Sequence, residues 1–180
     1  MKAIMDLHTH TLAAGHAYST LLENIDAALA MGLQYLGMSE HGPTSPGGPH
    51  NFFFSNYKVI PRIYDREENT GRVIPKPDGS LRLLCGVEAN ICSTNGELDL
   101  EERYLQKMDY ALAFTAGSRK ENTLASVRAF QNPYVKILGH PDDGRFPLDY
   151  DELVREARQA QAVLEVNNSS LNPQSARQGG

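Results

Sequence analysis

The chain contains little cysteine and no run of apolar residues long enough to cross a membrane. Its first residues, MKAIMDLHTH, lack the apolar core of a signal peptide, because Asp6 and His8 interrupt it at once. The two cysteines, Cys85 and Cys92, are seven positions apart and form no C-x-x-C pair. We therefore expect reduced thiols, a cytoplasmic location and no membrane partner.

Basic residues are also scarce, with 17 Lys and Arg against 22 Asp and Glu, a net charge of -5. This balance argues against nucleic-acid binding as the main task. The chain has no internal repeat and no low-complexity run. Its 180 residues and 41% hydrophobic content are enough for one domain that buries roughly 70% of its unfolded surface.

Short apolar runs alternate with longer amphipathic ones. Strands are expected at 3–10, 33–41, 80–91, 109–115, 134–141 and 162–170. Helices are expected at 21–32, 100–108, 122–132 and 147–161, and at the charged end of 56–69, where Pro61 obscures the start. The first should end at Gly32. Asn122 or Thr123 should cap the helix at 122–132, and Asp149 the helix at 147–161. This order predicts an α/β fold with mostly parallel strands.

Polar residues stand at the carboxyl ends of these expected strands, the edge that carries the site in α/β proteins. They are His8, His10, His41, Glu88, His140, Asn167 and Asn168. In the sequence HTH, two imidazoles at i and i+2 leave a strand on the same face and are able to converge on one divalent ion. A carboxylate among imidazoles suits a bridge, because its two oxygens bind two ions at once. We predict a metal site made by His8, His10, His16, His41, Glu88 and His140, and a structural role for His50 in its Gly/Pro loop.

Several ordered motifs resemble the PHP family, named for polymerase and histidinol phosphatase, and most closely its YcdX-like branch. They are HTH, GHAYSTLLENI, SEHGP, GVEANI, GHPDD and EVNNSS, and the resemblance runs from Met1 to about Arg177. It implies one PHP domain over residues 1–180, with the fold of a distorted (β/α)7 barrel. It also implies up to three ions, zinc or manganese: one at His8, His10 and Glu88; one at Glu88 and His140; and one at His16 and His41.

Two departures from the family pattern accompany this resemblance. The family carries a histidine after its fourth strand, where this chain reads ALAFTAGSRKENT. The family also ends with a strand carrying an Asp-x-His pair, and this sequence reaches Gly180 before such a strand. We therefore expect about six strands, a C-terminally short and open barrel with an exposed sheet edge, and one protein ligand fewer for each ion.

Four further residues are candidates for the site, each with an alternative. Asp6 either accepts the N–H of a ligand imidazole or makes local hydrogen bonds in its strand. Arg62 and Arg145 either contact phosphate in a bidentate way or form surface ion pairs. Asn168 either reaches the substrate or caps the following turn.

The resemblance implies a metal-dependent phosphatase that acts on a small phosphorylated substrate. Bound metal lowers the pKa of coordinated water to about 7, so no serine or cysteine nucleophile is needed. The alternatives are a histidinol-phosphatase-like or nuclease-like phosphoesterase, and a non-catalytic metal-binding module. The open edge also predicts self-association into a homo-oligomer.

Overall fold

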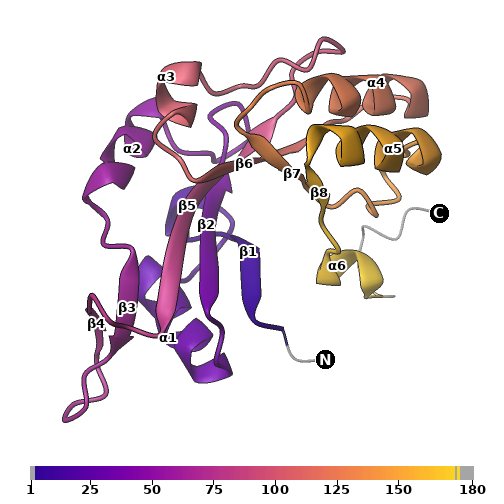
Figure 1. Cartoon of the computed structure of the whole chain (residues 1–180). Coiled ribbons are helices and arrows are strands. Elements are labelled where there is room, and N and C mark those ends of the chain that lie inside the picture. Colours follow the sequence, from indigo (N-terminus) through magenta and orange to yellow (C-terminus); the bar gives the residue numbers. More distant parts are fainter. Residues whose placement is uncertain (1–2, 173, 175–180) are drawn as a thin grey trace.

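The computed structural model describes residues 3–172 and 174. The centre of the protein is a curled parallel sheet. Its strand order is β1-β2-β5-β6-β7-β8, and each neighbouring pair is parallel. The strands are β1 (Met5–Thr9), β2 (Tyr35–His41), β5 (Leu81–Asn90), β6 (Tyr110–Phe114), β7 (Val135–Leu138) and β8 (Val163–Leu164). The sheet curls into a half-barrel (Figure 1). The prediction of an α/β fold with six strands forming a partial barrel is confirmed. The outermost residues of the domain predicted over 1–180 lie outside the described part.

The alternation of side chains along strand β5 determines which face of the sheet Glu88 lies on. Leu83, Cys85 and Val87 are fully buried in the main hydrophobic core. Because successive side chains of a strand point to opposite faces, Glu88 lies on the other face of β5 from these three. The carboxylate of Glu88 is nevertheless buried, with 1% of the residue exposed. The sheet therefore separates an apolar core from a buried polar group.

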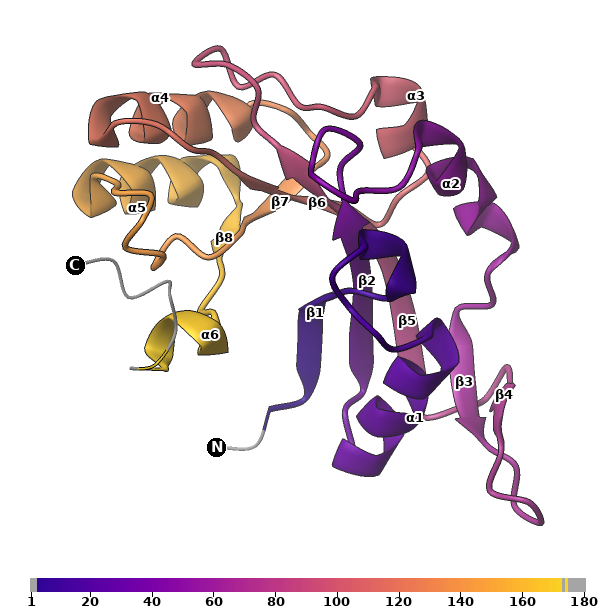
Figure 2. The same ribbon diagram turned by 180° about the vertical axis from the view of Figure 1, so that it is seen from behind.

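Two helices begin and end where their terminal residues predict. Helix α1 (Leu21–Met31) starts with a capping box of Thr20 and Glu23 and stops at Gly32, whose φ is 70°. Helix α5 (Tyr150–Ala160) starts at Asp149, whose side chain accepts the backbone N–H of Glu152. Figure 2 shows α5 side by side with α4 (Arg119–Ala129), on the part of the sheet formed by β6, β7 and β8. These helices cover the second half of the sheet.

The predicted N-cap of α4 is wrong. The helix starts at Ser118, which forms a capping box with Glu121, and not at Asn122 or Thr123. The Asn122 side chain is buried and donates to the carbonyls of Gly117 and Pro147. A Ser-x-x-Glu signature one turn upstream thus overrides the two later candidates.

The helix predicted within 56–69 is also wrong. Asn56–Val59 forms a short 3-10 helix after α2 (Asn51–Ser55), and the chain then enters β3 (Ile63–Arg66), which pairs antiparallel with β4 (Val73–Pro75) and with the start of β5. Pro61 lacks a backbone N–H, so it separates the two elements. Tyr64 is buried against the core, which favours the strand.

The remaining helices are short. The helix expected at 100–108 is reduced to α3 (Glu102–Leu105), and the strand expected at 162–170 ends early because α6 (Asn168–Leu171) follows it. Among the described helices, none is long and apolar enough to cross a bilayer. Strands β1 and β8 end the sheet on its two sides, since each pairs with one neighbour within the described residues.

Candidate metal centre

Histidines and one glutamate converge at the carboxyl ends of β1, β2, β5 and β7, with β6 between the last two in the sheet. His8 lies in β1 and His10 follows it, while His41 ends β2 directly opposite Glu88 of β5 in the parallel register. His140 follows β7 after one residue, and its φ of 29° is unusual for a residue other than glycine. Strands far apart in sequence thus bring together all six side chains of the predicted metal site.

The Glu88 carboxylate is the centre of this cluster. Its Oε1 accepts a hydrogen bond from His140 Nε2 at 2.9 Å. Its Oε2 lies 3.2 Å from Nε2 of both His8 and His10 and 2.8 Å from Nδ1 of His41. None of these three approaches has hydrogen-bond geometry, so buried Oε2 has no donor among the described residues. Imidazole nitrogens that converge on a carboxylate oxygen with no hydrogen bond fit a bound cation.

Two groups of side chains have ligand atoms close enough together to hold an ion. One consists of His8, His10 and Glu88, and the other of His10, His16 and His41; within each group the atoms lie within 4.8 Å of one another. The first group is the set predicted for the first ion, and the second adds His10 to the predicted third pair. Nε2 of His16 and Nε2 of His41 are only 2.7 Å apart. The number and identity of ions stay predictions.

Burial falls from Glu88 outward to solvent. Glu88 and His140 are buried, His10 and His41 are half-buried, and His16 is exposed. The cluster is therefore reached from the side of His16. This residue lies in the loop between the short 3-10 helix Leu12–Ala14 and α1, so a loop histidine completes a set that strands otherwise supply.

The protonation of the cluster follows from its packing. Burial raises the pKa of Glu88, but its interactions with the surrounding histidines outweigh it and hold that pKa well below its usual range. Burial lowers the pKa of His8, yet Glu165 and Glu88 raise it to about 10. The pKa of His16 is lowered by burial and by repulsion from His41 and His10. Glu88 is thus ionised at neutral pH, and a cation binding His8 has to displace a proton.

Two acidic residues beside the cluster, one half-buried and one buried, were missed by sequence reasoning. Glu165, just after β8, accepts a hydrogen bond from His8 Nδ1 at 2.8 Å. Glu40 is fully buried, and its Oε1 accepts from the backbone and hydroxyl of Thr11. Both carboxylates stand within strand-end motifs, VLEVNN and SEH, that carry other candidates. That position was the signal available for them.

The role predicted for Asp6 belongs to Glu165. Asp6 is exposed and accepts the backbone N–H of His8 at 3.1 Å, which is the local hydrogen bond of the alternative interpretation. The ring N–H of His8 is met instead from β8, on the opposite side of the half-barrel.

The structure places the remaining three candidates, Arg62, Arg145 and Asn168, at different distances from the histidine cluster. Arg62 pairs with Asp109, which precedes β6, so it lies at the amino edge of the sheet and away from the histidines. This contact is the surface ion pair of its alternative interpretation. Arg145 lies in the loop after His140 and binds Asp143 through Nε and Nη2 at 2.9 and 2.6 Å. Asn168 is the exposed first residue of α6, whose cap is Asn167.

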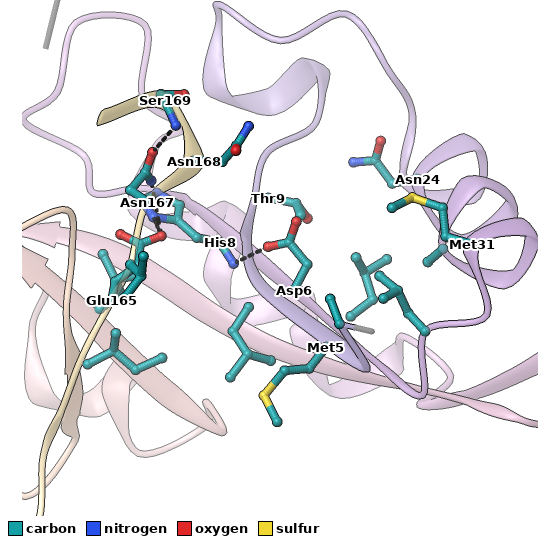
Figure 3. Close-up of a pocket in the computed structure, with 18 of the residues that line it drawn as sticks. Met5, Asp6, His8, Thr9, Asn24, Met31, Glu165, Asn167, Asn168 and Ser169 are labelled. Atoms are coloured by element: carbon teal, nitrogen blue, oxygen red, sulfur yellow. Dashed lines mark hydrogen bonds and ion pairs between the residues drawn. The ribbon is translucent and has the colours of Figure 1, made fainter. Parts of the chain in front are cut away.

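A cavity of about 700 Å³ opens between β1 and β8 beside the cluster. Figure 3 shows His8, Glu165 and Asn167 gathered at one wall and Asn24 and Met31 of α1 at the other. Asn168 also lines this cavity. His50, by contrast, caps α2 by accepting the backbone N–H of Phe52, which is a structural role.

Comparison with known proteins places this chain in a family. The chain is 41% identical over 179 residues to a probable phosphatase of Clostridium acetobutylicum and 41% identical over 178 residues to one of Clostridium novyi; each alignment covers 95% or more of this chain and 67% of the relative. It is 40% identical over 178 residues to a probable phosphatase of Caldanaerobacter subterraneus subsp. tengcongensis, covering 95% of this chain and 65% of the relative. The chain belongs to this family of probable phosphatases.

The chain spans about two thirds of the length of the curated relatives it matches. No protein-family model matches it. A histidine and glutamate cluster that could hold a metal ion is consistent with a phosphatase family, because divalent ions serve phosphoryl chemistry.

Proposed function

We propose that this protein is a metal-dependent phosphatase of the PHP family, in its YcdX-like branch, which hydrolyses small phosphomonoesters. The observation that carries the proposal is the buried Glu88 carboxylate, whose two oxygens face four imidazoles from three other strands. A buried carboxylate is costly unless hydrogen bonds or a cation compensate its charge, and Glu88 Oε2 has no hydrogen bond among the described residues. The names of the relatives support the reaction class.

The donor set fits a divalent transition metal. Imidazole nitrogen and carboxylate oxygen are ligands of zinc and also of manganese. In this proposal His8, His10 and Glu88 hold one ion, Glu88 and His140 a second, and His16 and His41 a third. The position of His10 in both groups of ligand atoms supports adjacent ions that share residues. Glu88 is then the bridge of a multinuclear site.

The chemistry at this site needs no protein nucleophile. A divalent cation supplies a nucleophile from water at neutral pH and neutralises phosphate charge. The protein's own groups hold the geometry: Glu88 stays ionised because the histidines lower its pKa, and His16 leaves the cluster accessible from solvent. Arg145, in the loop beside His140, is the candidate for contacting the phosphate, with Asp143 fixing its guanidinium.

We also propose that the whole of residues 1–180 forms one PHP domain of the distorted (β/α)7-barrel type. The six parallel strands in one curled sheet support it. The free sides of β1 and β8 face the cavity, which is the arrangement of an open barrel. In this proposal the substrate is small and phosphorylated, and nucleic acid is not a partner, given the net charge of -5.

The Glu88→Gln variant tests the bridging role. An amide keeps the size of the side chain and removes one anionic oxygen, so two ions lose a ligand together. We expect zinc affinity and hydrolysis of p-nitrophenyl phosphate each to fall by on the order of 100-fold or more, since even residues outside the ligand set cost about 10–100-fold. The matched control is Glu68→Gln in the turn between β3 and β4, which should leave both unchanged.

Three outcomes separate the candidates. Full zinc binding and full turnover in Glu88→Gln would contradict the bridge. Zinc binding by the wild type without hydrolysis of p-nitrophenyl phosphate or histidinol phosphate would leave a non-catalytic metal-binding module. A strong preference for histidinol phosphate would identify the histidinol-phosphatase-like alternative.

A further inference from the structure

Glu165 joins two strand ends of the histidine cluster. Its Oε1 accepts from His8 Nδ1 at 2.8 Å and its Oε2 accepts from the backbone N–H of His140 at 2.5 Å. The side chain of Asn167 donates to the same Oε1 at 3.1 Å. Figure 3 shows Glu165 and Asn167 next to the His8 ring at the wall of the cavity. One half-buried carboxylate therefore touches β1 and the end of β7 from its position after β8.

The first contact decides which nitrogen of His8 faces the cluster. An ionised carboxylate only accepts hydrogen bonds, so His8 carries a proton on Nδ1. The other ring nitrogen, Nε2, then points to Glu88 Oε2 at 3.2 Å. Which nitrogen of an imidazole binds a metal is set by the hydrogen bond that the other nitrogen makes.

The second contact holds a strained backbone. His140 has a φ of 29°, in the left-handed region that residues with a side chain rarely occupy. Such a conformation persists where surrounding contacts offset its cost. Glu165 accepts the N–H of this residue, and the hydroxyl of Tyr150 donates to the carbonyl of Pro141, which follows. The imidazole of His140 is thereby directed at Glu88 Oε1, at 2.9 Å.

We infer that Glu165 is a positioning residue of the metal centre. It fixes the Nδ1–H tautomer of His8 and the backbone of His140, so that both rings present Nε2 to the Glu88 side of the cluster. The inference rests on the proposed function, in which this cluster binds metal. It gives β8, the last strand of the sheet, a role in the site although none of the predicted ligands lies on it.

The test compares Glu165→Gln with the wild type. The two hydrogen bonds use different oxygens of Glu165, and glutamine replaces one of these oxygens with an NH2 donor, so one of the two N–H groups loses its acceptor. We expect zinc affinity, measured by competition with a chromophoric chelator, to fall about 10–100-fold. The control is Asp65→Asn in β3, which alters a carboxylate that accepts the backbone N–H groups of Arg66 and of Ser80, the residue before β5. It should bind zinc within twofold of the wild type.

Nitrogen-15 spectra of the histidine rings give a readout that a merely structural role would not move. In zinc-loaded wild-type protein His8 should carry its proton on Nδ1 and bind through Nε2, and in Glu165→Gln this state should lose population. A wild-type His8 that binds zinc through Nδ1 would overturn the inference without any variant, even if Glu165→Gln fails to fold.

The two proposals fail in different ways. Equal zinc affinity and the same His8 tautomer in Glu165→Gln and wild type would overturn the role of Glu165 and leave the metal-dependent phosphatase intact. Absence of zinc binding in the wild type would overturn the proposed function and, with it, the role of Glu165 in a metal centre.

Discussion

A methyl group added at Gly37 would displace the strand that carries the H-x-H pair. A Cβ atom at this position would lie 2.6 Å from Cα and 2.7 Å from the carbonyl oxygen of Leu7 in β1. The Tyr110 hydroxyl is nearer still, but the two Leu7 atoms belong to the backbone, so no side-chain rotation relieves their contact. The Leu7 carbonyl also accepts a hydrogen bond from the Tyr110 hydroxyl, which holds β1 in place from β6. The strand therefore has to move as a whole.

The size of the displacement follows from these distances. Ordinary van der Waals contact begins at 3.4 Å, so β1 has to move away from β2 by about 0.8 Å. Overpacking of this kind typically costs about 1–3 kcal/mol. For a chain of this size that corresponds to a fall in melting temperature of roughly 2–12 °C. His8 and His10 move with the strand, and a misplacement near 1 Å lowers turnover by on the order of 100-fold.

Calorimetry and a zinc competition titration on Gly37→Ala measure the two effects separately. The control is Gly71→Ala in the turn before β4, where a Cβ has nothing within 4 Å but φ is 68°. This control should lose about 1–2 kcal/mol of stability through backbone strain and keep its zinc affinity. If Gly37→Ala binds zinc and turns over substrate like the wild type, the placement of β1 by this close approach is refuted.

Two further predictions concern the stability of the fold. Asp149→Ala removes the cap of α5 and should cost about 1 kcal/mol in the free energy of unfolding, seen by thermal denaturation, with zinc affinity unchanged; an unchanged melting temperature would contradict the cap. Burial raises the pKa of Asp143, but its hydrogen bonds with Arg145 outweigh this and lower that pKa below the usual value. A carboxyl with a lowered folded pKa stabilises the fold above its unfolded pKa of about 3.9 and loses that contribution as the pH falls. Denaturant titrations from pH 6 to pH 3 should therefore show a steeper loss of stability in wild type than in Asp143→Asn, and equal slopes would contradict it.

The six parallel strands were predictable because each is a short apolar run bounded by a polar strand end. Helices α1 and α5 were predictable because Gly32 is a strong signal for the end of α1 and Asp149 for the start of α5. The β3–β4 hairpin was not, since the charged stretch after Pro61 has no clear period of its own. Its strand conformation depends on Tyr64 packing against the core, a contact that is long-range in sequence.

The ligand candidates were predictable for a related reason. Residues at the carboxyl ends of parallel strands share one edge, so His8, His41 and Glu88 had to come together. Which further residues contact these side chains depends on how far the sheet curls. Glu165 reaches His8 only because β8 turns back toward β1 across the cavity, whereas Arg62 lies at the opposite edge of the sheet. Curvature of this kind is a property of the packed sheet and is absent from local sequence.

Elemental analysis of the purified protein tests the central claim most directly. The protein is prepared without chelator, reloaded with zinc or manganese and passed through a desalting column before measurement. The account predicts at least one tightly bound ion per wild-type chain and a clear loss in Glu88→Gln. Well under one ion per wild-type chain, both as purified and after reloading, would contradict it.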